Sequence, residues 1–193
     1  DPETAAGGTL ARWTRLGSQV HIVIAAQGDK GITNPPEESA RIAGLRSEEA
    51  RQAAGTLGAK SCELLGIPDG EVKNDKSLRA RLVKVIRESQ PDVVMGPDPT
   101  AVFFGDTYVN HQDHRELGWA VLDAVNAAAN PLYFPESVSD STPAWQARQM
   151  FLSGTLEPNA WVDIETDLET KIAALGCHQT QLTDQWYRTF FKE

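Results

Sequence analysis

The sequence predicts an α/β fold in which a mostly parallel β-sheet is covered by helices on both faces. Short runs of apolar, β-branched residues recur along the chain, as is typical of strands buried on both faces of a sheet. Longer stretches with apolar residues at helical spacing lie between these runs. The alternation of strands and helices indicates βαβ units, which build a parallel sheet of the Rossmann-like kind.

The predicted strands are short apolar runs. Residues 20–26 (VHIVIAA) and 91–97 (PDVVMGP) are continuous apolar runs of strand length, and residues 62–68 (CELLGIP) are a shorter candidate of the same kind. Three further strand candidates follow later in the chain, at residues 132–135 (LYFP), 149–154 (QMFLSG) and 160–164 (AWVDI).

The predicted helices fill the intervals. Residues 39–58 and residues 77–89 place apolar side chains at helical spacing. Another helix is predicted from Asn110, a favourable N-cap residue, through residue 129. A helix with two glycines near its start opens the chain, and a final helix begins at about residue 167.

Length, charge and cysteine content narrow the class of protein. We expect residues 1–193 to form a single domain, because the sequence shows no linker, repeat or low-complexity tract. The net charge of -9 argues against nucleic acid or an anionic membrane as a partner. No apolar run has the length of a membrane span. Two widely separated cysteines without C-x-x-C spacing indicate reduced thiols and a cytoplasmic protein, and a homo-oligomer is left open.

Acidic residues follow the predicted strands. Asp29, Asp69 and Asp98 come directly after the first three strands, and Asp106 lies a little further on. Because ligands of open parallel sheets bind at the carboxyl ends of the strands, these residues predict a polar site at that edge. Aspartates that serve only as turn residues are the alternative for each of them taken alone.

The segment YVNHQDHREL, residues 108–117, contains two of the four histidines. With Asn110 as the N-cap, His111 and His114 share one face of the first helical turn and Asp113 is the third helical residue. Two imidazoles beside a carboxylate suit metal binding or proton transfer. A polar helix start without further function is the alternative reading.

The segments DPETAAGGTLA, LGIPDGE, FFGDTYVNHQDHRELGWAVLDAV and KIAALGCHQTQ occur in the same order in a known family. On these motifs the chain resembles the zinc-dependent N-deacetylases of the PIG-L or LmbE-like family, which act on N-acetylglucosamine conjugates. The family's opening motif, A-H-P-D-D-P-E, is matched here only from its second aspartate, Asp1. The resemblance therefore implies that a histidine ligand and the aspartate that acts as general base lie upstream, so that the sequence is N-terminally incomplete.

The resemblance also implies roles for individual residues. Asp1 and His114 correspond to metal ligands for one Zn²⁺ per chain, or another divalent cation. His111 corresponds to the histidine that stabilises or protonates the tetrahedral intermediate, and Asp113 to the residue that orients it. An alignment that makes Asp1 the general base is the alternative. The implied reaction is metal-assisted hydrolysis of an N-acetyl group.

The substrate implied by the resemblance is a small N-acetylated amino sugar conjugate. Asp29, Asp69 and Arg46 are candidates for contacts to sugar hydroxyls, and Tyr108 for the pocket wall. A surface salt bridge is the alternative for Arg46, and packing is the alternative for Tyr108. For the whole protein, a non-catalytic sugar-binding relative and an amidase acting on a sugar–thiol conjugate stay open. His21 is interpreted as structural, and His178 either as structural or as a residue near the site.

Overall fold

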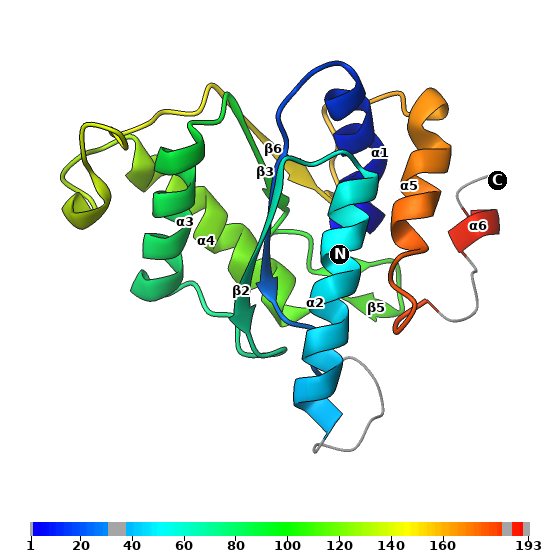
Figure 1. The fold of residues 1–193 in the computed structure, drawn as a ribbon. Helices are drawn as coiled ribbons and strands as arrows, with labels where there is room; N and C mark the ends of the chain where they lie inside the picture. Colours follow the sequence, from blue (N-terminus) through cyan, green and yellow to red (C-terminus); the bar gives the residue numbers. More distant parts are fainter. Residues whose placement is uncertain (1, 31–37, 183–186, 191–193) are drawn as a thin grey trace. The chain divides into compact units, whose positions relative to one another are not determined.

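The computed structural model describes residues 2–30, 38–182 and 187–190, which form alternating strands and helices (Figure 1). The chain divides into two compact units. Unit 1 comprises residues 1–71 and 159–193, and unit 2 comprises residues 72–158. Each unit contains one pair of parallel strands. The prediction of a single domain stays a prediction.

Unit 1 contains a βαβ arrangement. The parallel strands run in register from His21↔Ser61 to Ile24↔Leu64, and the helix between them begins after a gap in the described residues. Helix α5 packs against α1 and α2, and these three helices lie side by side in Figure 1. The elements of unit 1 are α1 (Pro2–Arg15), β1 (His21–Ala26), α2 (Ser39–Thr56), β2 (Ser61–Ile67), η3 (Glu165–Asp167), α5 (Leu168–Leu175) and α6 (Tyr187–Phe190).

Unit 2 contains the second parallel pair, which runs from Val93↔Gln149 to Pro97↔Ser153. Helix α4 packs against both α3 and β3, and a two-residue antiparallel hairpin, β4–β5, precedes it. The elements of unit 2 are α3 (Lys76–Ser89), β3 (Val93–Pro97), β4 (Phe103–Phe104), β5 (Tyr108–Val109), α4 (Gln112–Ala128), η2 (Pro135–Ser137) and β6 (Gln149–Ser153).

A buried arginine closes the C-terminal end of α4. The side chain of Arg87 is fully buried and donates hydrogen bonds to a set of neutral acceptors. These acceptors are the backbone carbonyl oxygens of Ala127, Ala128, Asn130, Tyr133 and Phe134 and the hydroxyl of Ser137. Since the last carbonyl groups of a helix have no partner within it, Arg87 satisfies acceptors that burial would otherwise leave unpaired.

Most of the predicted elements are confirmed. The strands expected at residues 20–26, 62–68, 91–97 and 149–154 correspond to β1, β2, β3 and β6, and they pair in parallel. The helices expected at residues 39–58, 77–89 and 110–129 correspond to α2, α3 and α4.

Two predicted strands are wrong. Residues 132–135 form turns and the start of η2, because the carbonyl oxygens of Tyr133 and Phe134 accept hydrogen bonds from Arg87 rather than from a neighbouring strand. Residues 160–164 form no strand, and Trp161 is 79% exposed. In both segments apolar residues face solvent, so their hydrophobicity does not mark a buried strand.

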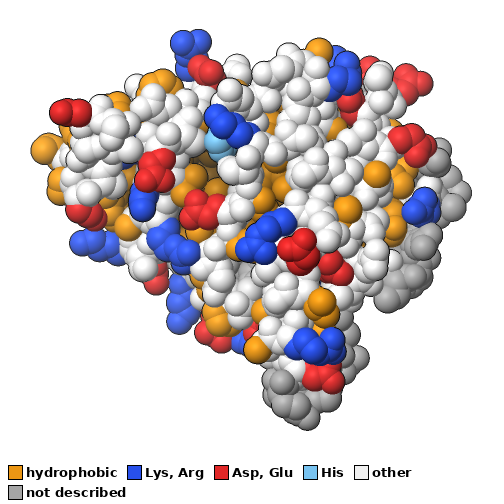
Figure 2. Space-filling model, in the orientation of Figure 1, with side chains coloured by type: hydrophobic (Ala, Val, Ile, Leu, Met, Phe, Trp, Pro, Cys, Tyr) orange, Lys and Arg blue, Asp and Glu red, His pale blue; other side chains and the backbone are white. Residues whose placement is uncertain are grey.

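Figure 2 shows acidic and basic side chains mixed over the face that it presents. The net charge of -9 is therefore not gathered into one acidic patch on that face. No helix of the described residues is both long and apolar enough to cross a membrane.

Candidate active site

The start of α4 differs from the prediction. The helix begins at Gln112, and its N-cap is His111 instead of Asn110. The side chain of Asn110 is used elsewhere, since its amide nitrogen donates to the carbonyl oxygen of Ala101 at 2.8 Å. In its place, Nδ1 of His111 accepts a hydrogen bond from the backbone N–H of Asp113 at 3.3 Å. Only His114 therefore lies within the first turn.

The contacts of Asn110 determine the tautomer of His114. A carbonyl oxygen only accepts, so the amide nitrogen of Asn110 must face Ala101 and its oxygen must face His114. That oxygen lies 3.0 Å from Nδ1 of His114, which therefore carries the proton. In the neutral ring the lone pair is then on Nε2. Asn110 itself is buried, and its backbone N–H donates to the carbonyl oxygen of Val102.

The same reasoning gives the tautomer of His111. A backbone N–H only donates, so Nδ1 of His111 is unprotonated in its contact with Asp113, and a neutral ring carries its proton on Nε2. The carboxylate of Asp113 lies 3.8 Å from Nδ1, beyond hydrogen-bond distance. One of its oxygens accepts from the backbone N–H of Val72 at 3.3 Å. Asp113 thus contacts His111 closely through its backbone.

Close packing against the end of β3 positions α4. A Cβ at Gly118 would lie 2.6 Å from the carbonyl oxygen of Pro97 and 2.9 Å from the ring of Pro99, so only glycine fits this helix position. The turn below it is fixed by Asp98, whose carboxylate accepts from the N–H and the hydroxyl of Thr100 at 2.8 and 2.6 Å. Burial acts to raise the pKa of Asp98, but these hydrogen bonds outweigh it and lower the pKa below its ordinary value.

The hairpin before α4 carries Tyr108. Its side chain is exposed, and its ring lies 6.0 Å from the ring of Phe104 across the hairpin. Strands of two residues leave no periodic pattern, so sequence reasoning did not find this hairpin.

In unit 1 the structure brings Asp29, Arg46 and Asp69 together. Asp29 accepts hydrogen bonds from the N–H of Asp69 at 2.9 Å and from Ser39 at 2.8 Å, and Asp69 accepts from the N–H of Gly28 at 3.2 Å. The two aspartates therefore link the loops that follow β1 and β2. Burial acts to raise the pKa of Asp29, and the hydrogen bonds lower it below its ordinary value.

Arg46 lies next to these aspartates. It is buried, and its guanidinium donates to the carbonyl oxygen of Gly28, while its Nε has no hydrogen-bond partner among the described residues. Burial lowers the pKa of Arg46 from its ordinary value. The surface salt bridge considered for Arg46 is therefore excluded by its burial.

Sequence reasoning missed a buried pair in unit 1. Oε2 of Glu3 lies 3.3 Å from Nε2 of His178, and the two side chains are 0% and 5% exposed. The sequence leaves His178 either structural or near the site, and it does not pair His178 with Glu3, because no spacing rule connects residues so far apart in the chain. Asp1 lies outside the described residues.

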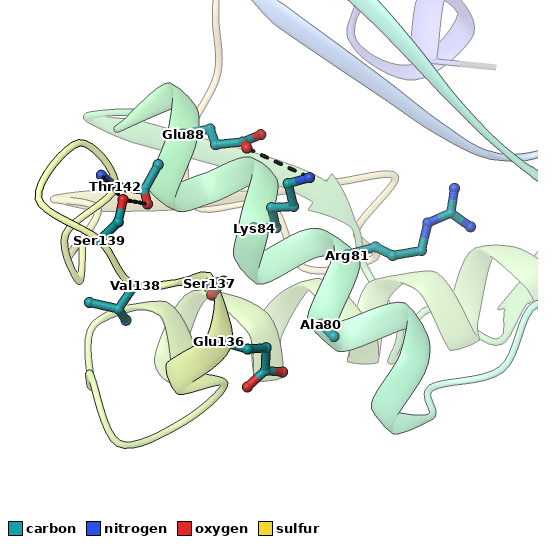
Figure 3. Close-up of a pocket in the computed structure, with 9 residues that line it drawn as sticks. All are labelled: Ala80, Arg81, Lys84, Glu88, Glu136, Ser137, Val138, Ser139 and Thr142. Atoms are coloured by element: carbon teal, nitrogen blue, oxygen red, sulfur yellow. Dashed lines mark hydrogen bonds and ion pairs between the residues drawn. The ribbon is translucent and has the colours of Figure 1, made fainter.

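Two further observations concern possible binding sites, namely clusters of metal-ligating side chains and surface grooves. Among the described residues, no group of three or more His, Cys, Asp or Glu side chains is close enough to hold a metal ion. A surface groove of about 420 Å³ lies in unit 2 between α3 and the loop around η2 (Figure 3). It contains the ion pair of Lys84 and Glu88 and none of the candidate site residues.

Comparisons with known proteins agree with the motifs. The family model described as GlcNAc-PI de-N-acetylase (PIG-L) matches residues 1–125. A diacetylchitobiose deacetylase from Thermococcus kodakarensis is 29% identical over 181 residues, covering 93% of this chain and 66% of the relative. A 4-oxalmesaconate hydratase from Pseudomonas putida is 34% identical over 179 residues, covering 89% and 66%.

The fold is also found among solved structures. N,N'-diacetylchitobiose deacetylase from Pyrococcus horikoshii matches with a TM-score of 0.87 and 27% identity, covering 99% of this chain and 71% of that one. The chain thus spans just under two thirds of the length of the two curated relatives named above, at 66% in each case.

Proposed function

Because the chain belongs to the GlcNAc-PI de-N-acetylase (PIG-L) family, we propose that it is a metal-dependent hydrolase that removes the N-acetyl group from a small amino sugar conjugate. The observation that carries this proposal is the orientation of His114 by Asn110. A metal-binding imidazole commonly donates from one ring nitrogen to a fixed acceptor, which leaves the lone pair of the other nitrogen for the metal. His114 has this arrangement through its contact at 3.0 Å.

The proposed metal is Zn²⁺, with Asp1 and His114 among its ligands. The residues present fit such an ion, because the lone pair of neutral His114 is on Nε2 and the Asn110 amide that sets this tautomer is itself buried and fixed. When bound, zinc would polarise the acetyl carbonyl and acidify a water molecule. His114 contributes a neutral ligand, and Asp1 a negative one.

His111 is proposed to stabilise the oxyanion of the tetrahedral intermediate. Its neutral ring carries the proton on Nε2, so it can donate a hydrogen bond without first becoming charged. To give a proton to the departing amine, the ring would first have to take up a second proton and become imidazolium, because a neutral imidazole that lost its Nε2 proton would be left as an anion. Asp113 is proposed as the residue that holds His111 in place, through the backbone contact at 3.3 Å.

The substrate contacts proposed for unit 1 differ in strength. Arg46 is proposed because its Nε–H lacks a hydrogen-bond partner among the described residues. That atom is buried, so a sugar hydroxyl would reach it only after the covering atoms move. Asp29 and Asp69 already accept hydrogen bonds from backbone N–H groups, and a carboxylate can accept more. Tyr108 is proposed for the pocket wall because its ring is exposed.

The test measures acetate release from a panel of N-acetylated sugars, with and without a chelator, on the full-length protein. We expect His114→Ala to lose both zinc and activity. His111→Ala should keep zinc and lower kcat by about 100- to 1,000-fold, as expected for loss of one oxyanion donor. The matched control is His21→Ala, because His21 is an exposed residue of β1 whose ring contacts Ser61. Release of zinc by His111→Ala would contradict these roles.

A second candidate function is hydration of a carbon–carbon double bond. The observation that favours it is the 34% identity to the 4-oxalmesaconate hydratase. A conjugated unsaturated dicarboxylate loses its ultraviolet absorbance when water adds to the double bond, so the same preparations can be tested for this loss. Absorbance loss without acetate release from any sugar would replace the deacetylase proposal with the hydratase.

A further inference from the structure

Helix α1 is fixed at its first turn by a buried carboxylate and imidazole. Oε2 of Glu3 and Nε2 of His178 lie 3.3 Å apart, and both side chains are almost completely removed from solvent. Neither carboxylate oxygen and neither ring nitrogen has a hydrogen-bond partner among the described residues. The two side chains thus face each other in the interior, where removing one partner of a buried ionisable pair is costly.

The next turn of α1 is packed without free space against the segment that leads to His178. A Cβ at Gly8 would lie 2.5 Å from the side chain of Ile164, and a Cβ at Gly7 would lie 3.2 Å from that of Lys171. The absence of side chains at Gly7 and Gly8 therefore leaves room for the side chains of Lys171 and Ile164 to pack against the helix. At the far end of α1, Arg15 donates two hydrogen bonds to Asp167 at 2.8 and 2.9 Å.

These contacts differ in whether they restrict the position of α1 or the orientation of its first turn. Apolar packing is non-directional, so it holds α1 against its neighbours but constrains rotation of the first turn weakly. A charged or hydrogen-bonding pair with one partner on each segment favours a single orientation. Glu3 is two residues after Asp1, so whatever orients Glu3 also constrains the chain within two peptide units of Asp1.

We propose that Glu3 and His178 are a positioning pair, which sets the orientation of the first turn of α1 and thereby aims Asp1. The inference rests on the proposed function, in which Asp1 is a metal ligand. Neither residue contacts substrate in this proposal. Their effect on the reaction passes through the geometry of Asp1.

The main variant is His178→Leu, and the conservative variant is Glu3→Gln, which keeps a hydrogen-bonding group opposite His178. The double variant Glu3→Leu/His178→Leu covers the case in which His178→Leu does not fold, because it leaves no unpaired buried charge. The matched control is His21→Leu, an exposed histidine of unit 1 on β1.

Three measurements are made on the full-length protein. The first is hydrogen exchange at the amides of residues 6–9, which donate to the carbonyl groups of residues 2–5 in a helix that starts at Pro2. The second is zinc affinity by competition with a chelator. The third separates kcat from KM at saturating zinc.

We expect His178→Leu to exchange faster at residues 6–9 while the second half of α1 stays protected. Its zinc affinity should fall about 10- to 100-fold, the usual effect of losing a residue that orients a ligand. The kcat should fall and KM change less than about twofold, since substrate contacts remain. Glu3→Gln should regain most of the zinc affinity, and His21→Leu should match the native protein.

Native exchange at residues 6–9 in folded His178→Leu, or in the folded double variant, would overturn the proposal. So would faster exchange spread evenly over α1, α2 and α5, since that would indicate general loss of stability. If the native protein releases no acetate, the proposed reaction fails while the exchange measurement still decides whether the pair orients the first turn.

Discussion

In our proposal His114, in the first turn of α4, and Asp1, the residue that precedes α1 in the sequence, bind the metal, yet the starts of the two helices are held in opposite ways. The start of α4 is fixed by a hydrogen-bonded amide, Asn110, whose partners Ala101 and His114 lie within nine residues of it. The start of α1 is fixed by Glu3 and His178, a buried pair without hydrogen bonds to other described residues. One arrangement is local and neutral, and the other joins distant segments and involves ionisable groups.

The two arrangements act on different parts of the structure. Asn110 orients a single side chain, His114, whereas the pair of Glu3 and His178 is proposed to orient a helical turn. Asn110 acts on one imidazole and sets its tautomer, so its loss should change metal affinity more than stability. Glu3 and His178 act on the first turn of α1, and Arg15 acts on its last turn, so each should affect the end of the helix at which it lies. The three predictions that follow test each side of this comparison.

The largest effect is expected from Gly118→Ala in α4. The new Cβ would lie 2.6 Å from a backbone oxygen of Pro97, which cannot move aside as a side chain can. We expect a loss of about 1–3 kcal/mol in the free energy of unfolding, as for other overpacked sites. Denaturant titration measures it. Gly44→Ala is the matched control, because a Cβ there meets nothing within 4 Å, and it should gain about 0.5–1 kcal/mol. Equal changes in stability at the two positions would show that α4 does not pack closely against Pro97 and Pro99 at Gly118.

The next effect is expected from Asn110→Ala. Without the amide oxygen, Nδ1 of His114 loses the contact at 3.0 Å that fixes its tautomer. Zinc affinity should fall about 10- to 100-fold, measured by competition with a chelator. Asn126→Ala, at an exposed position of α4, provides the control. If Asn110→Ala bound zinc normally but unfolded more readily, Asn110 would act on the stability of the protein and not on the metal-binding side chain of His114.

The smallest effect is expected from Asp167→Asn, and it depends on pH. Hydrogen bonding from Arg15 lowers the pKa of Asp167 in the folded state. A carboxylate with a lowered folded-state pKa stabilises the protein above its unfolded pKa, about 3.9, and this contribution is lost as the pH falls through the folded value. The variant should therefore be less stable at pH 7 and lose less stability on acidification below about pH 4. Thermal unfolding across this range measures the change, and Arg15→Met should reproduce it. A variant with the native acid dependence would contradict the role given to this pair.

The fold was predictable where apolar runs and helical spacing coincide with burial. Residues 20–26 and 91–97 became β1 and β3, and each strand pairs in parallel with a neighbouring strand. Val20, Ile22 and Ala25 are buried, whereas most residues of β3 are half-buried. Residues 160–164 have a similar composition, but Trp161 faces solvent. Hydrophobicity alone does not tell these cases apart, since the difference depends on whether a neighbouring strand is present.

The candidate site was predictable where the residues are neighbours in sequence. The spacing of His111, Asp113 and His114 indicated a shared helix start. The choice of N-cap was wrong, and with it the placement of His111 within the first turn and of Asp113 as the third helical residue. That error arose because the side-chain amide of Asn110 donates a hydrogen bond to the carbonyl oxygen of Ala101. Capping preferences do not predict this contact. The pairing of Glu3 with His178 spans almost the whole chain, so no local pattern reveals it.

The separation of Glu3 from His178 also sets an order of events during synthesis. Ribosomes add about 5–20 residues per second. His178, which is 175 positions after Glu3, is therefore synthesised roughly 9–35 seconds after it. Arg15 waits almost as long for Asp167, 152 positions away. By contrast, the residues of the Asn110 network, Ala101 to His114, are made within about 1–3 seconds of one another. A nascent chain therefore holds a complete α4 start while α1, the first helix of the sequence, still lacks its anchors.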